Sequence, residues 1–282
     1  CCVQKNADLV PPVLKLLWIL LGTGEVHRDQ HIPLGVRSRL RLFAAQCILK
    51  LATCDAYASL ILPRMGRLSY ALQDECFQVR MHLLHDLLLY LMRDELPTEF
   101  HAAIFLVAFD PEDEPRVQVA SYTRRLQVLP PIVRHERLER IIVRFLHLLA
   151  HHPDLNAESP QTLCSFARYL EFYLACVACE TNIGVLARFS ACVRTYIDLS
   201  LSEPSVENSR PLYAMAELAQ FLIQRLADNH GWTIYPVDEE APCPKDILRS
   251  TGTIARSVLD GEVWELLQQQ PRRHRDKKTK VA

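Results

Sequence analysis

Glycine is scarce in this chain, and that scarcity limits the folds open to it. Eight of the 282 residues are glycine, which is about 3% against roughly 7% in an average protein. Glycine serves tight turns, bulges and phosphate-binding loops, so its shortage argues against all-β folds and glycine-loop nucleotide folds. Leucine, alanine and arginine, which favour helices, are abundant instead. The sequence therefore predicts an all-α protein, and 49% hydrophobic residues supply a sizeable core.

Apolar residues recur with helical spacing almost throughout the chain. Between Arg137 and Ala150, for example, they form one stripe at three- and four-residue steps. The predicted helices span 12–21, 38–53, 56–73 (with a break at Pro63 left open), 77–92, 97–109, 114–128, 135–150, 160–180, 183–200, 209–228 and 261–270. Helices that begin near Arg39, Val79 and Val117 lie 40 and 38 residues apart, close to the roughly 40–47 of HEAT and armadillo repeats. We therefore predict a HEAT-repeat α-solenoid of paired antiparallel helices, with residues 1–270 as a single array.

A turn motif accompanies these repeats. The string DECFQVR (74–80) closes one helix and opens the next, DPEDEPRV (110–117) is a weaker copy, and HHPDL (151–155) is weaker still. In HEAT repeats, an acid in the turn and a base early in the following helix can pair along the stack. We expect such residues to hold adjacent repeats in register rather than to contact a ligand. The residues with this predicted role are Asp74, Val79, Arg80, Asp110 and Arg116.

Two histidine pairs have spacings that metal sites use. His147 and His151 are four residues apart, but the zincin pattern needs a glutamate where Leu148 stands. No third ligand is apparent in the sequence. We therefore interpret them as polar surface residues, and His82 and His85 in the same way.

The cysteines and the one glycine-rich turn do not indicate catalysis either. Cys176 and Cys179 form a C-x-x-C without a second such pair, which favours core packing over a metal site. All ten cysteines are expected to be reduced, in an intracellular compartment. The string GTG (22–24) lacks the P-loop lysine and is expected to be a helix end. We expect no catalytic, metal-binding or cofactor-binding residue.

Two groups of arginines are candidates for partner binding. Along 135–150, an arginine stripe could meet an acidic peptide or phosphate, although a solvated face partly neutralised by Glu136 and Glu139 is the interpretation we favour. The second group lies where a loop enters the helix at 38–53, and there a partner contact and a solvated face are equally well supported. The candidates are Arg137, Arg140, Arg144, Arg37, Arg39 and Arg41.

The C-terminal end differs in charge from the rest. Six Lys or Arg against one Asp give residues 272–282 a charge of +5, which leaves −6 of the total −1 for the body. We expect residues 271–282 to be a disordered, solvated tail, with weak DNA contact or nuclear import as the sharper alternative. The basic residues are Arg272, Arg273, Arg275, Lys277, Lys278 and Lys280.

The N-terminal end gives no sign of a membrane span. The most apolar early stretch, 9–21, is too short to cross a bilayer and is interrupted by Pro11, Pro12 and Lys15. Because residue 1 is not methionine, we expect the chain to be a piece of a longer protein.

Four strings together resemble consecutive segments of one family. They are SRLRLFAAQCILKLA (38–52), LQDECFQVR (72–80), AAIFLVAFDPEDEPR (102–116) and FLHLLAHHPDL (145–155). The family is the precocious-dissociation-of-sisters family of sister chromatid cohesion proteins, which are HEAT-repeat regulators of cohesin. The resemblance covers about 38–267 and corresponds to the C-terminal third of the family's folded array. It implies a nuclear, chromatin-associated protein that binds the kleisin subunit of cohesin, cooperates with the wings-apart-like release factor and supports cohesin acetylation by its acetyltransferase.

We therefore expect a non-catalytic scaffold that regulates cohesin and sister chromatid cohesion. A stack of helix pairs offers long continuous surfaces, which suit extended partner segments. The alternatives are another HEAT scaffold, such as a nuclear transport receptor or a phosphatase scaffold, and an all-helical enzyme that uses the histidines.

Overall fold

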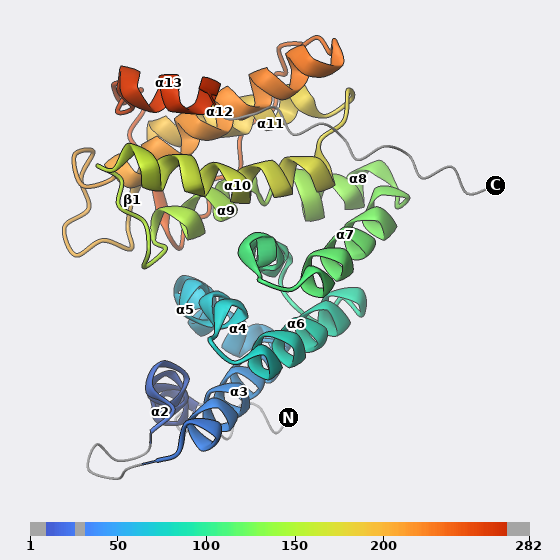
Figure 1. Ribbon diagram of the computed structural model, residues 1–282, viewed down its shortest axis with the longest axis vertical. Helices are drawn as coiled ribbons and strands as arrows, with labels where there is room; N and C mark the ends of the chain where they lie inside the picture. Colours follow the sequence, from blue (N-terminus) through green and yellow to red (C-terminus); the bar gives the residue numbers. More distant parts are fainter. Residues whose placement is uncertain (1–9, 26–31, 270–282) are drawn as a thin grey trace.

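The computed structural model describes residues 10–25 and 32–269, and helices account for most of them (Figure 1). The first half holds α2 (Val10–Thr23), α3 (Leu34–Leu51), α4 (Asp55–Ile61), η2 (Leu62–Arg64), α5 (Met65–Ser69), η3 (Tyr70–Gln73), α6 (Phe77–Met92), η4 (Thr98–Phe109), α7 (Asp113–Gln127), α8 (Pro131–Arg134), η5 (His135–Glu139) and α9 (Ile142–Ala150). The second half holds α10 (Pro160–Val177), α11 (Ile183–Cys192), η6 (Val193–Thr195), β1 (Tyr196–Asp198), α12 (Arg210–His230), β2 (Leu248–Ser250) and α13 (Gly261–Gln269). The all-α prediction is confirmed.

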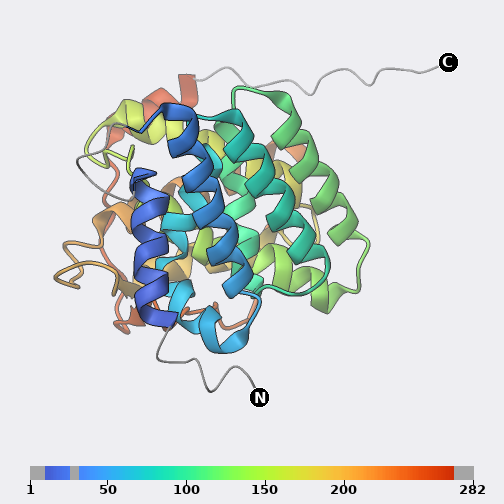
Figure 2. The same cartoon turned by 90° about the horizontal axis from the view of Figure 1, so that it is seen from below.

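Two layers of helices make up the first half of the chain. In one layer α3, α6 and α7 follow one another, each in contact with the next, and Figure 1 shows them as steps from blue to green. In the other layer the 3₁₀ helix η4 lies between the broken helix of 55–73 and α9 and contacts both. Seen from below, successive helices step across the molecule from α2 to α7 (Figure 2). Neighbouring repeats thus bury their apolar faces against one another, as in a solenoid.

The second half packs on the end of this stack. α10 contacts both η4 and α7, while α12 contacts α9, α10 and α11, and α13 contacts α10. The sequence marks these helices clearly. Ser159 caps α10 by accepting a hydrogen bond from the Thr162 N–H, and Pro160 follows at the first helical position. α12 ends at Gly231, which adopts the left-handed conformation with φ of 68°.

An aromatic cluster joins the two halves. Phe105 on η4, Phe145 on α9 and Tyr173 on α10 are fully buried, with ring centroids 4.9 to 5.7 Å apart. The Tyr173 hydroxyl donates a hydrogen bond to the Leu138 carbonyl at 2.6 Å, so its one polar atom is satisfied within the core. Core residues from α2 to α13 form one contiguous cluster around these rings.

The helix predicted over 183–200 is shorter than expected. α11 ends at Cys192, and after one 3₁₀ turn the chain forms β1, which pairs antiparallel with β2 in the register Tyr196–Ser250, Ile197–Arg249 and Asp198–Leu248. The stretch from Val193 to Ile197 is rich in β-branched and aromatic residues, which fit a strand better than a helix. Asp198 therefore lies on a strand and not on a helix.

The helix predicted over 135–150 is also interrupted. Residues 135–139 form a single π-helical turn, and α9 starts only at Ile142. α9 is buried on all sides, because η4, α11 and α12 all pack against it. The expected polar face along this segment is therefore wrong for Arg144 and His147, both of which are buried.

Candidate functional site

A ladder of ion pairs runs along the repeat turns, and its first rung joins α3 to the turn before α6. Arg41 donates to the Asp74 carboxylate through both Nε and Nη2, the latter at 2.9 Å, and to Glu75 at 3.0 Å. The hydrogen bond with Asp74 raises the pKa of the Arg41 guanidinium. Arg41 is thus occupied within the chain, at the start of the ladder.

The second rung joins α6 to the turn before α7. Arg80 donates from Nε to Asp110 at 2.8 Å and from Nη2 to Glu112 at 2.6 Å. Its Nη1 also donates back to the Asp74 carbonyl at 2.9 Å. Arg80 and Asp110 are each 7% exposed, so this pair is largely desolvated and its hydrogen bonds are charge-assisted.

Each aspartate of the ladder also accepts a backbone hydrogen bond in the turn before the next helix. The Asp74 carboxylate accepts from the Cys76 N–H at 2.8 Å, and Asp110 accepts from the Glu112 N–H at 3.0 Å. Arg116 repeats the position of Arg80, six residues after its aspartate, and donates to the Asp110 carbonyl and to Asp113. The ladder residues are thus bonded to one another across three repeats, while Val79 packs in the core beside Arg80.

A pocket of about 610 Å³ opens beside the ladder, between the repeat turns and the first half of α10. Its floor holds a polar network in which Gln73 donates to the Tyr169 hydroxyl at 2.6 Å and contacts His152 Nε2 at 2.6 Å. The Asp154 N–H donates to His152 Nδ1, so the ring is neutral with its proton on Nε2. Burial lowers the pKa of His152, which agrees with this neutral state.

The arginine stripe is neutralised by acids far away in the sequence as well as by Glu136 nearby. Arg144 is 3% exposed and makes two hydrogen bonds of 2.8 Å to Asp246, so the solvated-face interpretation is wrong for it. Arg140 pairs with Glu239 and Glu136, each at 3.3 Å. Arg137 pairs with Asp94 at the end of α6. The proline- and acid-rich segment at 235–246 therefore lies across this face as a strap.

The three arginines near the start of α3 have three different environments. Arg37 forms an ion pair with Glu25, across from the end of α2, and Arg41 belongs to the ladder. Arg39 is exposed on α3. The six basic residues of the predicted tail, Arg272 to Lys280, lie outside the residues that the structure describes.

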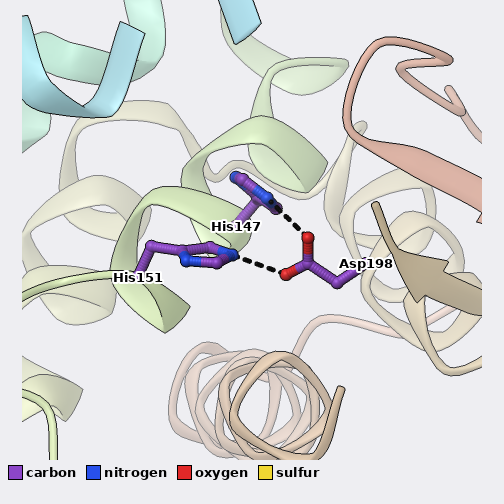
Figure 3. A group of neighbouring side chains, drawn as sticks. All are labelled: His147, His151 and Asp198. Carbon is purple, nitrogen blue, oxygen red and sulfur yellow. Dashed lines mark hydrogen bonds and ion pairs between the residues drawn. The ribbon is translucent and has the colours of Figure 1, made fainter. Parts of the chain in front are cut away.

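His147 on α9 is buried and His151, just after the end of α9, is partly exposed, and the two share a third possible ligand that the sequence did not reveal. Their rings converge on Asp198 of β1, with Nε2 of His147 and His151 at 3.2 and 2.6 Å from the two carboxylate oxygens (Figure 3). His147 is 7% exposed, and burial lowers its pKa. Among the described residues, His147, His151 and Asp198 form a group whose potential ligand atoms lie close enough together to hold a metal ion. The sequence did not indicate Asp198 as a ligand, because it lies 47 residues beyond His151 and within the helix predicted over 183–200.

The cysteines of the C-x-x-C string differ in environment. Cys176 is buried in α10, and burial raises the pKa of its thiol to about 11, so it is protonated at neutral pH. Cys179 lies beyond the end of α10, where its thiol contacts the Thr181 hydroxyl at 3.2 Å. The described part of the chain contains no disulfide. It also contains no helix long and apolar enough to span a bilayer.

Comparison with known families decides among the helical scaffolds. The sequence model of the family described as sister chromatid cohesion protein PDS5 matches residues 2–249, well over half of the chain. The chain belongs to the PDS5 family. PDS5 proteins are HEAT-repeat proteins, so the predicted HEAT architecture is confirmed with the family.

Individual PDS5 proteins are similar over long stretches. The PDS5 protein of Schizosaccharomyces pombe is 27% identical over 86% of this chain, and that of Saccharomyces cerevisiae is 23% identical over 89%. The PDS5 homolog A of Danio rerio is 34% identical over 51% of the chain. The chain spans 20%, 22% and 12% of the length of these three relatives.

Membership in the PDS5 family removes the rival functions. Transport receptors and phosphatase scaffolds are different HEAT families, and the PDS5 family consists of non-catalytic cohesion regulators. The chain therefore belongs to a family of sister chromatid cohesion proteins and not to a family of enzymes.

Proposed function

We propose that this chain is the C-terminal part of a PDS5 folded array, and that it regulates cohesin on chromatin in the nucleus. In this proposal the array binds the kleisin subunit of cohesin and brings the wings-apart-like release factor and the cohesin acetyltransferase to it. The observation that carries the proposal is the family match over residues 2–249. No bond is made or broken by the side chains of the scaffold.

The ladder supports a scaffold role physically. A protein that presents one long surface to an extended partner needs its repeats held in a fixed register. Arg41 and Arg80 support such a register, since each connects a helix of one repeat to the turn that opens the next, while Arg116 bonds to the turn before its own helix. Because these arginines are committed to the fold, the partner must contact other side chains, and Arg39 on the exposed face of α3 is the candidate.

Co-precipitation with the individual cohesin subunits tests the proposal. The purified chain is incubated separately with kleisin, the release factor, the acetyltransferase and an unrelated acidic protein. Retention of kleisin, but not of the acidic control, supports direct binding. If the chain retains none of these three proteins (kleisin, the release factor and the acetyltransferase), the proposed function of this segment is contradicted.

The same assay tests the role of Arg39. Arg39→Glu should weaken kleisin retention without lowering the thermal midpoint, because the side chain is exposed. Lys50→Glu, an equal change of charge at the exposed end of the same helix, is the matched control and should leave retention unchanged. Equal losses in both variants would show that only overall charge matters.

A further inference from the structure

His147 on α9, His151 just after its end and Asp198 on β1 have the composition of a transition-metal site. Two imidazole nitrogens and one carboxylate are among the ligand sets that proteins use for zinc. His147 and His151 lie one helical turn apart, and both turn Nε2 toward Asp198 (Figure 3). The candidate ligand atoms all lie within 4.8 Å of one another.

The spacing of these atoms is close to that around a tetrahedral ion. With metal–ligand distances of about 2.0–2.2 Å, neighbouring ligand atoms in a tetrahedron are about 3.4 Å apart. Nε2 of His147 is 3.2 Å from the nearer carboxylate oxygen, which matches this edge, and Nε2 of His151 is 2.6 Å from the other. The His151 contact is shorter than this edge, so admitting an ion requires the His151 ring to move outward. The His151 side chain is 30% exposed, so it has room to move and gives the ion a route in from solvent.

Surrounding hydrogen bonds already fix the third ligand. The Ser200 N–H donates to one Asp198 oxygen at 2.8 Å, and the Asp198 N–H is bonded to the Ser209 hydroxyl at 3.0 Å. Such contacts orient a ligand before the metal arrives. The Ser200 hydroxyl lies 3.1 Å from Nε2 of His147, beside the position of a fourth ligand.

We propose that His147, His151 and Asp198 bind one Zn²⁺ ion, which clips the end of α9 to the β1–β2 pair. Three protein ligands leave the fourth position to the Ser200 hydroxyl or a solvent molecule. The ion connects the repeat stack to the second half of the chain, and its role is structural. Asp198 supplies the third ligand that is not apparent beside His147 and His151 in the sequence. This proposal does not rest on cohesin binding.

Zinc titration of the chelator-treated chain tests the site. We expect one equivalent of Zn²⁺ to bind and to raise the thermal midpoint, since an ion that binds only the folded state stabilises it. Co²⁺ in place of Zn²⁺ should give the intense visible absorption of a four-coordinate ion. His151→Gln and Asp198→Asn each remove a ligand. Each should weaken Zn²⁺ binding by more than the about 10–100-fold that typically follows loss of a residue that only supports a ligand.

Matched controls separate this site from other histidines. His82→Gln and His85→Gln, on the exposed face of α6, should bind Zn²⁺ as the unchanged chain does. Helical circular dichroism without metal checks that His151→Gln, a change at a partly exposed position, is folded. The proposal is overturned if the chain binds no Zn²⁺, or if binding persists in both His151→Gln and Asp198→Asn.

Discussion

Among single residues, Arg80 carries the most constrained charge in the ladder. Its guanidinium contacts Asp110, Glu112 and the Asp74 carbonyl from a largely buried position. Arg80→Ala leaves the buried Asp110 carboxylate without this partner and should lower the free energy of unfolding by roughly 1–3 kcal/mol. Urea denaturation measures the change.

Arg124→Ala is the control for this experiment, because Arg124 is exposed on α7. A change at such a surface position should alter stability by no more than about 0.5 kcal/mol. An Arg80→Ala chain of normal stability that no longer binds its partner would instead make Arg80 a contact residue.

His101 should make the fold sensitive to mild acid. Its Nδ1 donates to the Thr98 carbonyl at 2.8 Å, and its Nε2 accepts from the Tyr122 hydroxyl at 2.9 Å, so the neutral ring is fully bonded. Burial lowers the pKa of His101 to about 4. Between that value and about 6.5, the unfolded chain binds a proton that the folded chain does not. The contribution of His101 to the free energy of unfolding is therefore fully present above about pH 6.5 and is lost as the pH falls toward 4. The expected loss is about 2 kcal/mol between pH 7 and pH 5.

Denaturation at pH 7 and pH 5 measures this decline. His101→Gln cannot be protonated and should show a smaller loss between the two pH values, even if it is less stable at both. His82→Gln, at an exposed position, should follow the unchanged chain. Equal losses in all three chains would assign the acid sensitivity to other groups.

Some residue contacts were predictable from sequence and others were not. Asp74, Arg80 and Asp110 are recognisable because the turn motif is local and recurs at the repeat length. Arg144 and Asp246 are 102 residues apart, and His151 and Asp198 are 47 apart. No periodicity connects such pairs, since only the packing of the second half onto α9 brings them together.

At the scale of elements, the strap at 235–246 fastens the second half to α9. Its strongest contact is Asp246 with Arg144, and Glu239 adds bonds to His135 and Arg140. Asp246→Ala would leave the Arg144 charge buried without its partner, which typically costs about 3–5 kcal/mol. We expect a lower thermal midpoint and faster proteolysis within 235–246.

A double variant separates the ion pair from simple packing. Arg144→Met with Asp246→Ala removes both charges and should recover much of the stability that Asp246→Ala loses, because apolar replacements of buried pairs are often neutral. If the double variant is no more stable than Asp246→Ala, the strap is held by other contacts.

Element type followed from sequence wherever one face of a helix meets the core. The helices at 77–92 and 160–177 agree closely with prediction, since both carry an apolar stripe and the second also has the Ser159 cap. The prediction was wrong at 193–200, where β-branched residues form a strand, and at 135–139, where a π turn interrupts the helix. Both departures lie where the second half covers α9, so tertiary packing overrides the local pattern there.

At the scale of the whole molecule, the opposite charges of body and tail lead to the last prediction. The tail has six basic residues and no apolar residue before Val281, so it offers no stripe to bury. Removing residues 272–282 should leave the thermal midpoint unchanged and abolish weak binding to duplex DNA. If all six basic side chains contact phosphates, log affinity should fall with log salt at a slope of about −5.

The intact chain and the chain without residues 272–282 are compared in three measurements. These are thermal unfolding, DNA binding at low salt and DNA binding at moderate salt. A chain with its six basic residues replaced by glutamine keeps the tail length and should bind DNA as weakly as the truncated chain. A lower thermal midpoint after truncation would show that the tail packs on the body. DNA binding that survives truncation would place the contact on the array itself, where the ladder arginines are already paired and the exposed Arg39 is the first residue to test.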